Sequence, residues 1–245
     1  MRKIAISLSK GGVAKTTTAV NLAAGLAKKG ARVLLLDTDT QGQVSFMFGL
    51  KPKVNLSDVI TGDCGLDEAT IQVRENLWII AGGREIAGIK RLIDRTDLGG
   101  EYTLSEAFTP IEKKFDFVLV DTSPGWDSVT LNVLFYAEEI LCPISLEVMT
   151  LHGLSSFIKS VEAVQKYNKN LKLRYIVPTF LDGRVKKSVE ILKQLEEFYP
   201  DRLCNPIHYN VRLSEAPGYA QTIYEFAPQS QGAIDYEQLT ERVYA

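Results

Sequence analysis

The sequence predicts a doubly wound α/β fold, in which a mostly parallel sheet carries helices on both faces. Short apolar runs alternate with longer amphipathic segments along the 245 residues, and this alternation is typical of βα units around a parallel sheet. Two runs, residues 33–36 and 117–120, are apolar at every position, as expected of strands covered on both faces. We therefore place these two strands in the middle of the sheet and expect one domain over residues 1–245.

Each element follows from apolar periodicity and from the residues that favour turns. Strands are expected at residues 3–8, 32–37, 77–81, 115–121, 139–143 and 173–179. Helices are expected at residues 15–29, 151–166, 185–198 and 236–243. The remaining long segments, residues 50–65 and 82–100, are expected to be loop-rich insertions on the same domain.

The composition excludes several classes of protein. The chain is 45% hydrophobic and 24% charged, which is ordinary for a globular protein and unlike a disordered one. No apolar run approaches the ~18 residues of a membrane helix, and residues 4–8 are too few for a signal peptide. The three cysteines are far apart in the sequence, so neither a zinc site nor a disulfide framework is expected. With a net charge of −2, nucleic-acid binding would need a local basic surface. We expect a cytoplasmic protein.

The first strand leads into a loop that is typical of a phosphate site. The loop and the start of the next helix consist of Lys10, Gly11, Gly12, Val13, Ala14, Lys15, Thr16 and Thr17. Backbone N–H groups of such a loop converge on an anion, and the positive end of the helix dipole faces it. Lys15 is expected to reach the β- and γ-phosphates of ATP, and the Thr16 hydroxyl to coordinate Mg²⁺.

Carboxylates follow two of the predicted strands at the ends nearest this loop. Asp37 and Asp39 follow the strand at 32–37, and Asp121 ends the strand at 115–121. Because ligands of open parallel sheets bind at the carboxyl ends of the strands, all three should lie at the edge that carries the phosphate loop. One such aspartate alone would be read as a cap or turn residue, but three at strand ends favour a metal and nucleotide site.

The loop resembles the deviant Walker A motif, KGGxGKTT, of the ParA/MinD family of P-loop ATPases. Ser9 and Ala14 stand where the strict P-loop pattern has glycine, and an alanine there is expected to need a negative φ and to crowd the phosphate. The resemblance implies that Lys10 crosses a dimer interface and contacts the nucleotide of the partner subunit. It further implies that Asp39 positions the attacking water.

The same resemblance assigns the metal site and the adenine site. It implies that Asp121 is the Walker B carboxylate, which binds Mg²⁺ through water, and that Asp37 assists at the metal. Thr40 stands where the family usually has proline. The adenine base is expected near Thr179 and Pro206.

A later segment, N-V-R-L-S-E-A-P at residues 210–217, resembles the ParA/Soj branch of partitioning ATPases. This branch forms an ATP-dependent sandwich homodimer that binds double-stranded DNA nonspecifically, and a ParB-like or cargo-adaptor protein stimulates hydrolysis. The resemblance assigns DNA contact to Arg212 and implies association with the nucleoid. Lys186 and Lys187 could join it, together with Lys193, although a solvated helix face explains these lysines equally well.

This chain departs from its relatives in the charge near that segment. Tyr209, Gln229 and Gln231 stand where related chains commonly carry arginines or a Ser-Arg-Gly sequence. We therefore expect weaker DNA binding with a smaller salt dependence.

Three alternatives to a partitioning ATPase remain at this point, and a fourth is disfavoured. A MinD-like membrane-associated ATPase would end in a basic amphipathic helix, whereas residues 236–245 carry two acids and one arginine. An ATP-dependent metabolic ligase of the dethiobiotin synthetase type shares the fold but does not account for residues 210–217. A scaffold that binds ATP without hydrolysing it would result if Ala14 or Thr40 blocked turnover. An electron carrier of the nitrogenase-reductase type would need a second cluster cysteine beside Cys142.

Overall fold

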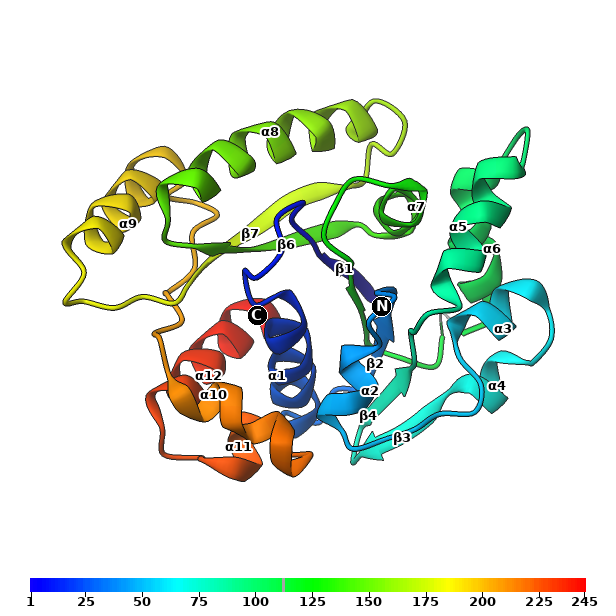
Figure 1. The fold of residues 1–245 in the computed structure, drawn as a ribbon, viewed down its shortest axis with the longest axis horizontal. Coiled ribbons are helices and arrows are strands. Elements are labelled where there is room, and N and C mark those ends of the chain that lie inside the picture. Colours follow the sequence, from blue (N-terminus) through cyan, green and yellow to red (C-terminus); the bar gives the residue numbers. More distant parts are fainter. Residues whose placement is uncertain (112) are drawn as a thin grey trace.

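The computed structural model describes residues 1–111 and 113–245 and is built around one seven-stranded sheet (Figure 1). The strand order is β3-β4-β2-β5-β1-β6-β7, and every neighbouring pair is parallel except β3 and β4. The strands are β1 Arg2–Ile6, β2 Val33–Asp37, β3 Ile71–Arg74, β4 Leu77–Ile80, β5 Phe117–Asp121, β6 Glu139–Ser145 and β7 Lys172–Thr179.

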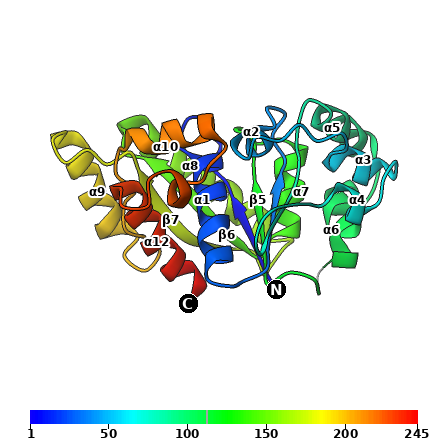
Figure 2. The ribbon, with the colours of Figure 1, turned by 90° about the horizontal axis from the view of Figure 1, so that it is seen from below.

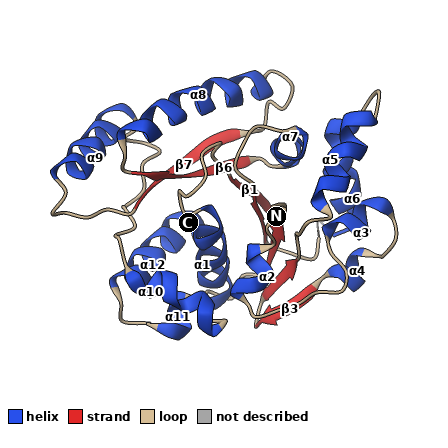
Figure 3. Ribbon diagram, in the orientation of Figure 1, coloured by secondary structure: helices blue, strands red, loops and turns tan. Residues whose placement is uncertain are grey.

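Helices cover both faces of this sheet, as Figure 3 shows by colour. The longer α-helices are α1 Lys15–Lys28, α5 Ile86–Arg95, α7 Ser128–Tyr136, α8 Val148–Gln165, α9 Lys186–Phe198 and α12 Gln231–Tyr244. The shorter ones are α2 Gln43–Met47, α3 Leu56–Thr61, α4 Leu66–Ala69, α6 Thr103–Phe108, α10 Val211–Glu215 and α11 Ile223–Phe226. The described residues also contain three 3-10 turns, at η1 Gly100–Tyr102, η2 Thr109–Ile111 and η3 Ala216–Tyr219.

The sheet separates two hydrophobic cores. One face packs against α1, α11 and α12, and the other packs against α3 and α5 to α9. Figures 1 and 2 both show α12 lying beside α1. A buried hydrogen bond of 3.1 Å joins the hydroxyls of Thr18 and Tyr236 across this contact. Gly25 is required here, because a Cβ atom at this position would lie 2.2 Å from Thr240 Oγ1 and 2.7 Å from the Tyr224 hydroxyl.

The predicted strands and the fold class are confirmed. β2 and β5 are buried at every position and pair with each other inside the sheet, because their apolar side chains face both helix layers. The four expected helices are present, although α8 and α12 begin three and five residues earlier than expected. Ser230 explains the earlier start of α12, since its hydroxyl accepts a hydrogen bond from the Ala233 N–H and caps the helix.

The prediction of loop-rich insertions was wrong. Residues 50–65 contain α3, which begins at a capping box formed by Asn55 and Asp58. Residues 82–100 contain α5, which buries Ile86, Ile89 and Ile93 on one face. Both signals are present in the sequence. The edge strand β3 and the helix α7 were not predicted either.

No helix in the described residues has the length and apolarity that a membrane crossing requires.

Candidate nucleotide site

The phosphate loop borders a cavity of about 590 Å³ at the carboxyl ends of β1, β2 and β5. The lining residues are Gly11, Gly12, Ala14, Lys15, Thr16, Thr17, Asp39, Thr40, Gln41, Gln43, Ser123, Pro124, Asp127 and Phe180. Most residues predicted for the loop therefore face one cavity. Val13 differs, because its side chain is fully buried in one of the two hydrophobic cores.

The expected negative φ at Ala14 was wrong. Its φ is 65° and its ψ is 34°, which is the left-handed region that L-residues other than glycine rarely adopt. Ala14 also precedes the first turn of α1 and offers no side-chain acceptor to it. The first N–H groups of α1 are thus left for another acceptor, as a phosphate site requires. Position 14 thus keeps the backbone conformation that favours glycine, although it carries an alanine.

Lys15 is the buried cation of the cavity. Its side chain donates a hydrogen bond of 2.9 Å from Nζ to the backbone oxygen of Lys10, which folds the ammonium back across the loop. Burial lowers the pKa of Lys15, and the nearby charges of Asp121 and Asp39 oppose this effect. A buried ammonium with so few partners is suited to pair with an incoming anion.

Asp121 is the least satisfied group of the site. Its side chain is fully buried, and neither carboxylate oxygen makes a well-formed hydrogen bond within the described part of the chain. Burial, and then the charge of Asp37, raise the pKa of Asp121 well above its usual range, while the adjacent Thr16 hydroxyl and Lys15 lower it. Buried polar atoms are normally paired. A carboxylate with free oxygens beside the Thr16 hydroxyl therefore fits a hydrated Mg²⁺ ion.

Asp37 and Asp39 hold the segment after β2 in different ways. Asp37 is fully buried, and its two oxygens accept the N–H groups of Asp39 at 2.9 Å and Val44 at 3.1 Å. Burial raises the pKa of Asp37 to about 6. Asp39 is half-buried and faces the cavity, and its Oδ1 accepts the Gln41 N–H at 3.0 Å. The hydrogen bonds of Asp37 stabilise the turn after β2, and its role at the metal stays a prediction. The carboxylate of Asp39, by contrast, can contact a ligand in the cavity.

Lys10 is held by its own chain at the mouth of the site. Its Nζ donates to Glu147 Oε2 and to Thr150 Oγ1, both at 2.9 Å. Thr150 Oγ1 also shares a buried hydrogen bond of 2.9 Å with Ser145 Oγ at the end of β6. Lys10 is not among the residues that line the cavity. In this conformation, its ammonium is attached to the start of α8.

Thr179 and Pro206 lie on adjoining segments, outside the residues that line the cavity. The Thr179 hydroxyl donates to the backbone oxygen of Val13 at 3.3 Å and so joins β7 to the phosphate loop. The neighbouring Ile207 N–H donates to the oxygen of Pro178 at 2.8 Å. This places the half-buried Pro206 beside the end of β7. Their assignment to the adenine base stays a prediction.

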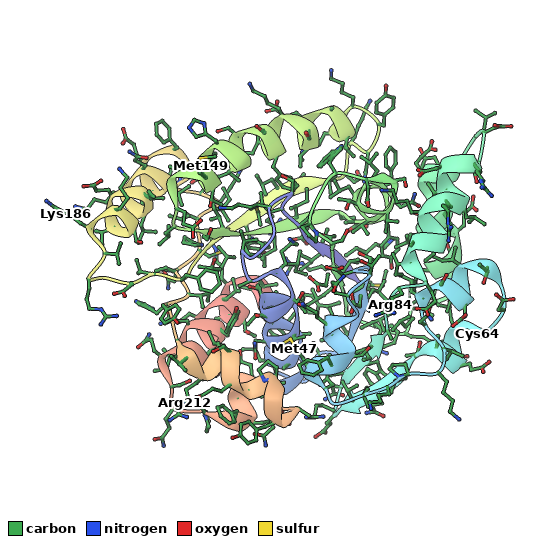
Figure 4. The ribbon with its side chains drawn as sticks, viewed as in Figure 1. Met47, Cys64, Arg84, Met149, Lys186 and Arg212 are labelled. Atoms are coloured by element: carbon green, nitrogen blue, oxygen red, sulfur yellow. The ribbon has the colours of Figure 1, made fainter. Side chains whose placement is uncertain are left out.

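The residues proposed for DNA contact lie on separate helices. Arg212 is exposed on α10, where its guanidinium pairs with Glu215 Oε2 at 2.9 Å and lies 6.0 Å from the centre of the Phe226 ring. Lys186 and Lys187 begin α9, and Lys187 pairs with Glu190 at 3.2 Å. Figure 4 shows Lys186 and Arg212 projecting outward on the same side of the view. Their joint role stays a prediction.

Several residues of the cavity were not predicted from the sequence. Gln43, Ser123, Asp127 and Phe180 line it without belonging to a recognisable spacing pattern. Phe180 has a φ of 59°, which is unusual for a bulky residue. It comes directly after β7, where a strand end at the phosphate edge was the only available signal.

Comparisons with known proteins agree with this geometry. A family model described as an AAA domain matches residues 1–173. The chain is 33% identical to the sporulation initiation inhibitor protein Soj of Bacillus subtilis, over 99% of this chain and 98% of that protein. It is 34% identical to the chromosome-partitioning ATPase Soj of Thermus thermophilus, over 100% and 96%. A solved cobyrinic acid a,c-diamide synthase from Mycobacterium smegmatis, with bound ADP and magnesium, superimposes with a TM-score of 0.86 at 29% identity, over 100% and 94%.

Proposed function

Because the chain belongs to the Soj/ParA family of chromosome-partitioning ATPases, we propose that it is a slow, Mg²⁺-dependent ATPase that dimerises on ATP and positions a cargo on DNA. The observation that carries this proposal is the unsatisfied carboxylate of Asp121 beside Lys15 and Thr16. A buried carboxylate and a buried ammonium without full sets of partners are costly, and a ligand that supplies the missing partners offsets this cost.

The residues predicted for the site have separate roles in this reaction. The first N–H groups of α1 and the ammonium of Lys15 would bind the phosphates, and Thr16 and Asp121 would hold the metal ion. When bound, Mg²⁺ neutralises the charge that develops on the transferred phosphoryl group. Asp39 orients the attacking water, because its carboxylate faces the cavity beside the phosphate loop. The adenine base would lie near Thr179 and Pro206.

Lys10 makes the site dependent on a second copy of the chain. Its position at the mouth, attached to Glu147 and Thr150, lets it move toward the nucleotide of a partner subunit when those contacts break. A further cation, supplied by a ParB-like or adaptor protein, would complete the stabilisation of the transition state. The basal rate is therefore expected to be low.

Nonspecific double-stranded DNA is the proposed surface on which the ATP dimer acts. Arg212, Lys186 and Lys187 are the proposed contacts, and phosphate contacts of this type do not depend on base sequence. Since Arg212 and Lys187 each pair with a glutamate of their own helix, binding should be modest. The proposed location is the cytoplasm, in association with the nucleoid.

The Asp39→Ala variant tests the ATP-dependent dimer. Removing the water-positioning carboxylate should trap the dimer, which size-exclusion chromatography with light scattering would detect with ATP and not with ADP. The exposed Asp94, on α5, gives a matched control, and Asp94→Ala should behave as wild type. An Asp39→Ala protein that stays monomeric at saturating ATP would refute either the role of Asp39 or the dimer.

A second candidate is an ATP-dependent ligase, favoured by the similarity to the diamide synthase. Such an enzyme would consume ATP only with a carboxylic acid substrate and a nitrogen donor, and DNA would have no effect. The partitioning proposal instead expects ATP turnover without either substrate and DNA binding in ATP but not in ADP. Measuring these two quantities on the wild-type protein separates the candidates.

A further inference from the structure

Arg84 is an exposed arginine close to the candidate nucleotide site that has no assigned role. It lies in the loop between β4 and α5, and no hydrogen bond or ion pair joins its guanidinium to any other residue in 1–111 or 113–245. By contrast, Arg32, Arg184 and Arg212 are each paired with a carboxylate. Figure 4 shows Arg84 between α2 and α5, well away from Lys186 and Arg212.

The backbone that carries Arg84 is fixed to the segment after β2. The N–H of Gly83 donates to the backbone oxygen of Asp39 at 3.1 Å. Gly82 lies against Asp37 so closely that a Cβ atom at this position would come within 2.8 Å of the carboxyl group. The start of the Arg84 side chain is therefore held directly behind the turn that contains Asp39.

A second cavity lies between Arg84 and this turn. It has a volume of about 560 Å³ and is lined by Thr40, Gln41, Gly83, Arg84 and Ala87. Thr40 and Gln41 also line the phosphate cavity, so the two cavities share a wall. The second cavity is lined by a hydroxyl, a side-chain amide and a guanidinium, and none of its lining residues is acidic. Such a set of donors suits a tetrahedral oxyanion.

We propose that Arg84, with Thr40 and Gln41, forms an anion subsite that takes a phosphate group at the far side of the phosphate cavity. The group is either the terminal phosphate of bound ATP or the inorganic phosphate that hydrolysis releases. Lys15 lines the phosphate cavity from the loop side, whereas Arg84 lines the second cavity, beyond the wall formed by Thr40 and Gln41. The guanidinium would there offset the repulsion between the Asp39 carboxylate and the phosphate. This inference rests on the proposed ATPase function.

Binding measurements on Arg84→Ala, with Mg²⁺ present, test the subsite and distinguish its two sources of phosphate. Isothermal titration calorimetry would give the affinities for a non-hydrolysable ATP analogue, for ADP, and for inorganic phosphate added to the ADP-loaded protein. If the subsite takes the terminal phosphate, the affinity for the analogue should fall about tenfold while that for ADP is unchanged, since a charge-assisted contact is lost. If it takes released phosphate, only the affinity for inorganic phosphate should fall.

Two further variants serve as controls. Arg84→Lys keeps the charge but loses the planar fork, and it should retain part of the affinity. Arg91→Ala removes another exposed arginine, on α5, and should change nothing. The inference is overturned if Arg84→Ala binds the ATP analogue and inorganic phosphate with the same affinities as Arg91→Ala. It is also overturned if Arg84→Ala loses as much affinity for ADP as for the analogue. Failure of the wild-type protein to bind either nucleotide would overturn the proposed function itself.

Discussion

The nucleotide edge of the sheet and the surface formed by α9 and α10 both carry clustered charges, but they hold them differently. At the nucleotide edge, Lys15 and Asp121 are buried and lack full sets of partners. On the helical surface, Arg212 and Lys187 are exposed and satisfied by glutamates three residues away. Incomplete pairing of buried charge is costly and indicates a ligand, whereas exposed ion pairs contribute little and indicate no particular function.

The largest expected effect tests the buried charges at the nucleotide edge of the sheet. Lys15→Ala should reduce ATP affinity more than about 100-fold, because it removes a charge-assisted contact within a low-dielectric site. The ligand-free protein should be no less stable, since burial already disfavours the charged lysine. Nucleotide titration and thermal unfolding would measure both quantities. Lys28→Ala, which removes an exposed lysine of the same helix, should change neither, and normal ATP affinity in Lys15→Ala would refute the phosphate site.

The next largest effect tests whether the surface formed by α9 and α10 binds DNA. Arg212→Ala should weaken binding to random-sequence duplex DNA roughly three- to tenfold and reduce the salt slope by about 1. Glu215→Ala should strengthen binding, because it releases Arg212 from its ion pair. Fluorescence anisotropy with ATP present would measure the affinities. Arg32→Ala is the matched control, as this arginine is also exposed and paired. Equal DNA affinity for Arg212→Ala and wild type at low salt would remove the proposed contact.

A smaller effect concerns Lys10, a half-buried residue of the phosphate loop that pairs with the exposed Glu147 and so lies between the two kinds of region. Glu147→Gln should strengthen ATP-dependent dimerisation by up to about fivefold, since an exposed ion pair contributes about 0–1 kcal/mol and must break to release Lys10. Sedimentation equilibrium would measure this. Glu190→Gln breaks a comparable pair with Lys187 and should have no effect. Weaker dimerisation in Glu147→Gln would mean that Glu147 positions Lys10 for the partner.

The smallest effect concerns the backbone of the phosphate loop. Ala14→Gly should stabilise the ligand-free protein by roughly 0.5–1 kcal/mol, because the left-handed conformation costs alanine about 1–2 kcal/mol and glycine's greater freedom in the unfolded state offsets part of that gain. Chemical denaturation would detect the change. Ala24→Gly, at an ordinary position in α1, should destabilise the protein by a similar amount. A loss of stability in Ala14→Gly would show that the loop is not strained.

The same contrast explains what could be predicted from the sequence. β2 and β5 were recognisable because strands covered on both faces must be apolar throughout, and the phosphate loop because its chemistry fixes residue types at fixed spacing. Asp121 follows from its place at a strand end. The conformation of Ala14 was wrongly expected, since local preference favours a negative φ and the surrounding contacts decide otherwise.

Other features could not be predicted because they depend on contacts between distant segments. Nothing near Lys10 in the sequence indicates its contacts with Glu147 and Thr150, which lie 137 and 140 residues away. Arg84 lies near the nucleotide site only because Gly82 and Gly83 contact the turn after β2. The missed helices α3 and α5 differ from these cases, since their capping and apolar periodicity were present in the sequence and were overlooked.

The contact of α1 with α11 and α12 constrains how this chain can evolve. The hydroxyls of Tyr224 and Thr240 occupy the space that a side chain at position 25 would fill, and they lie 3.3 Å from each other. A lineage that replaced Gly25 would have to lose bulk at positions 224 and 240 as well. Among related chains, these three positions should therefore vary together, and substitutions in α1, the helix that begins at Lys15, should be accompanied by substitutions in α11 and α12.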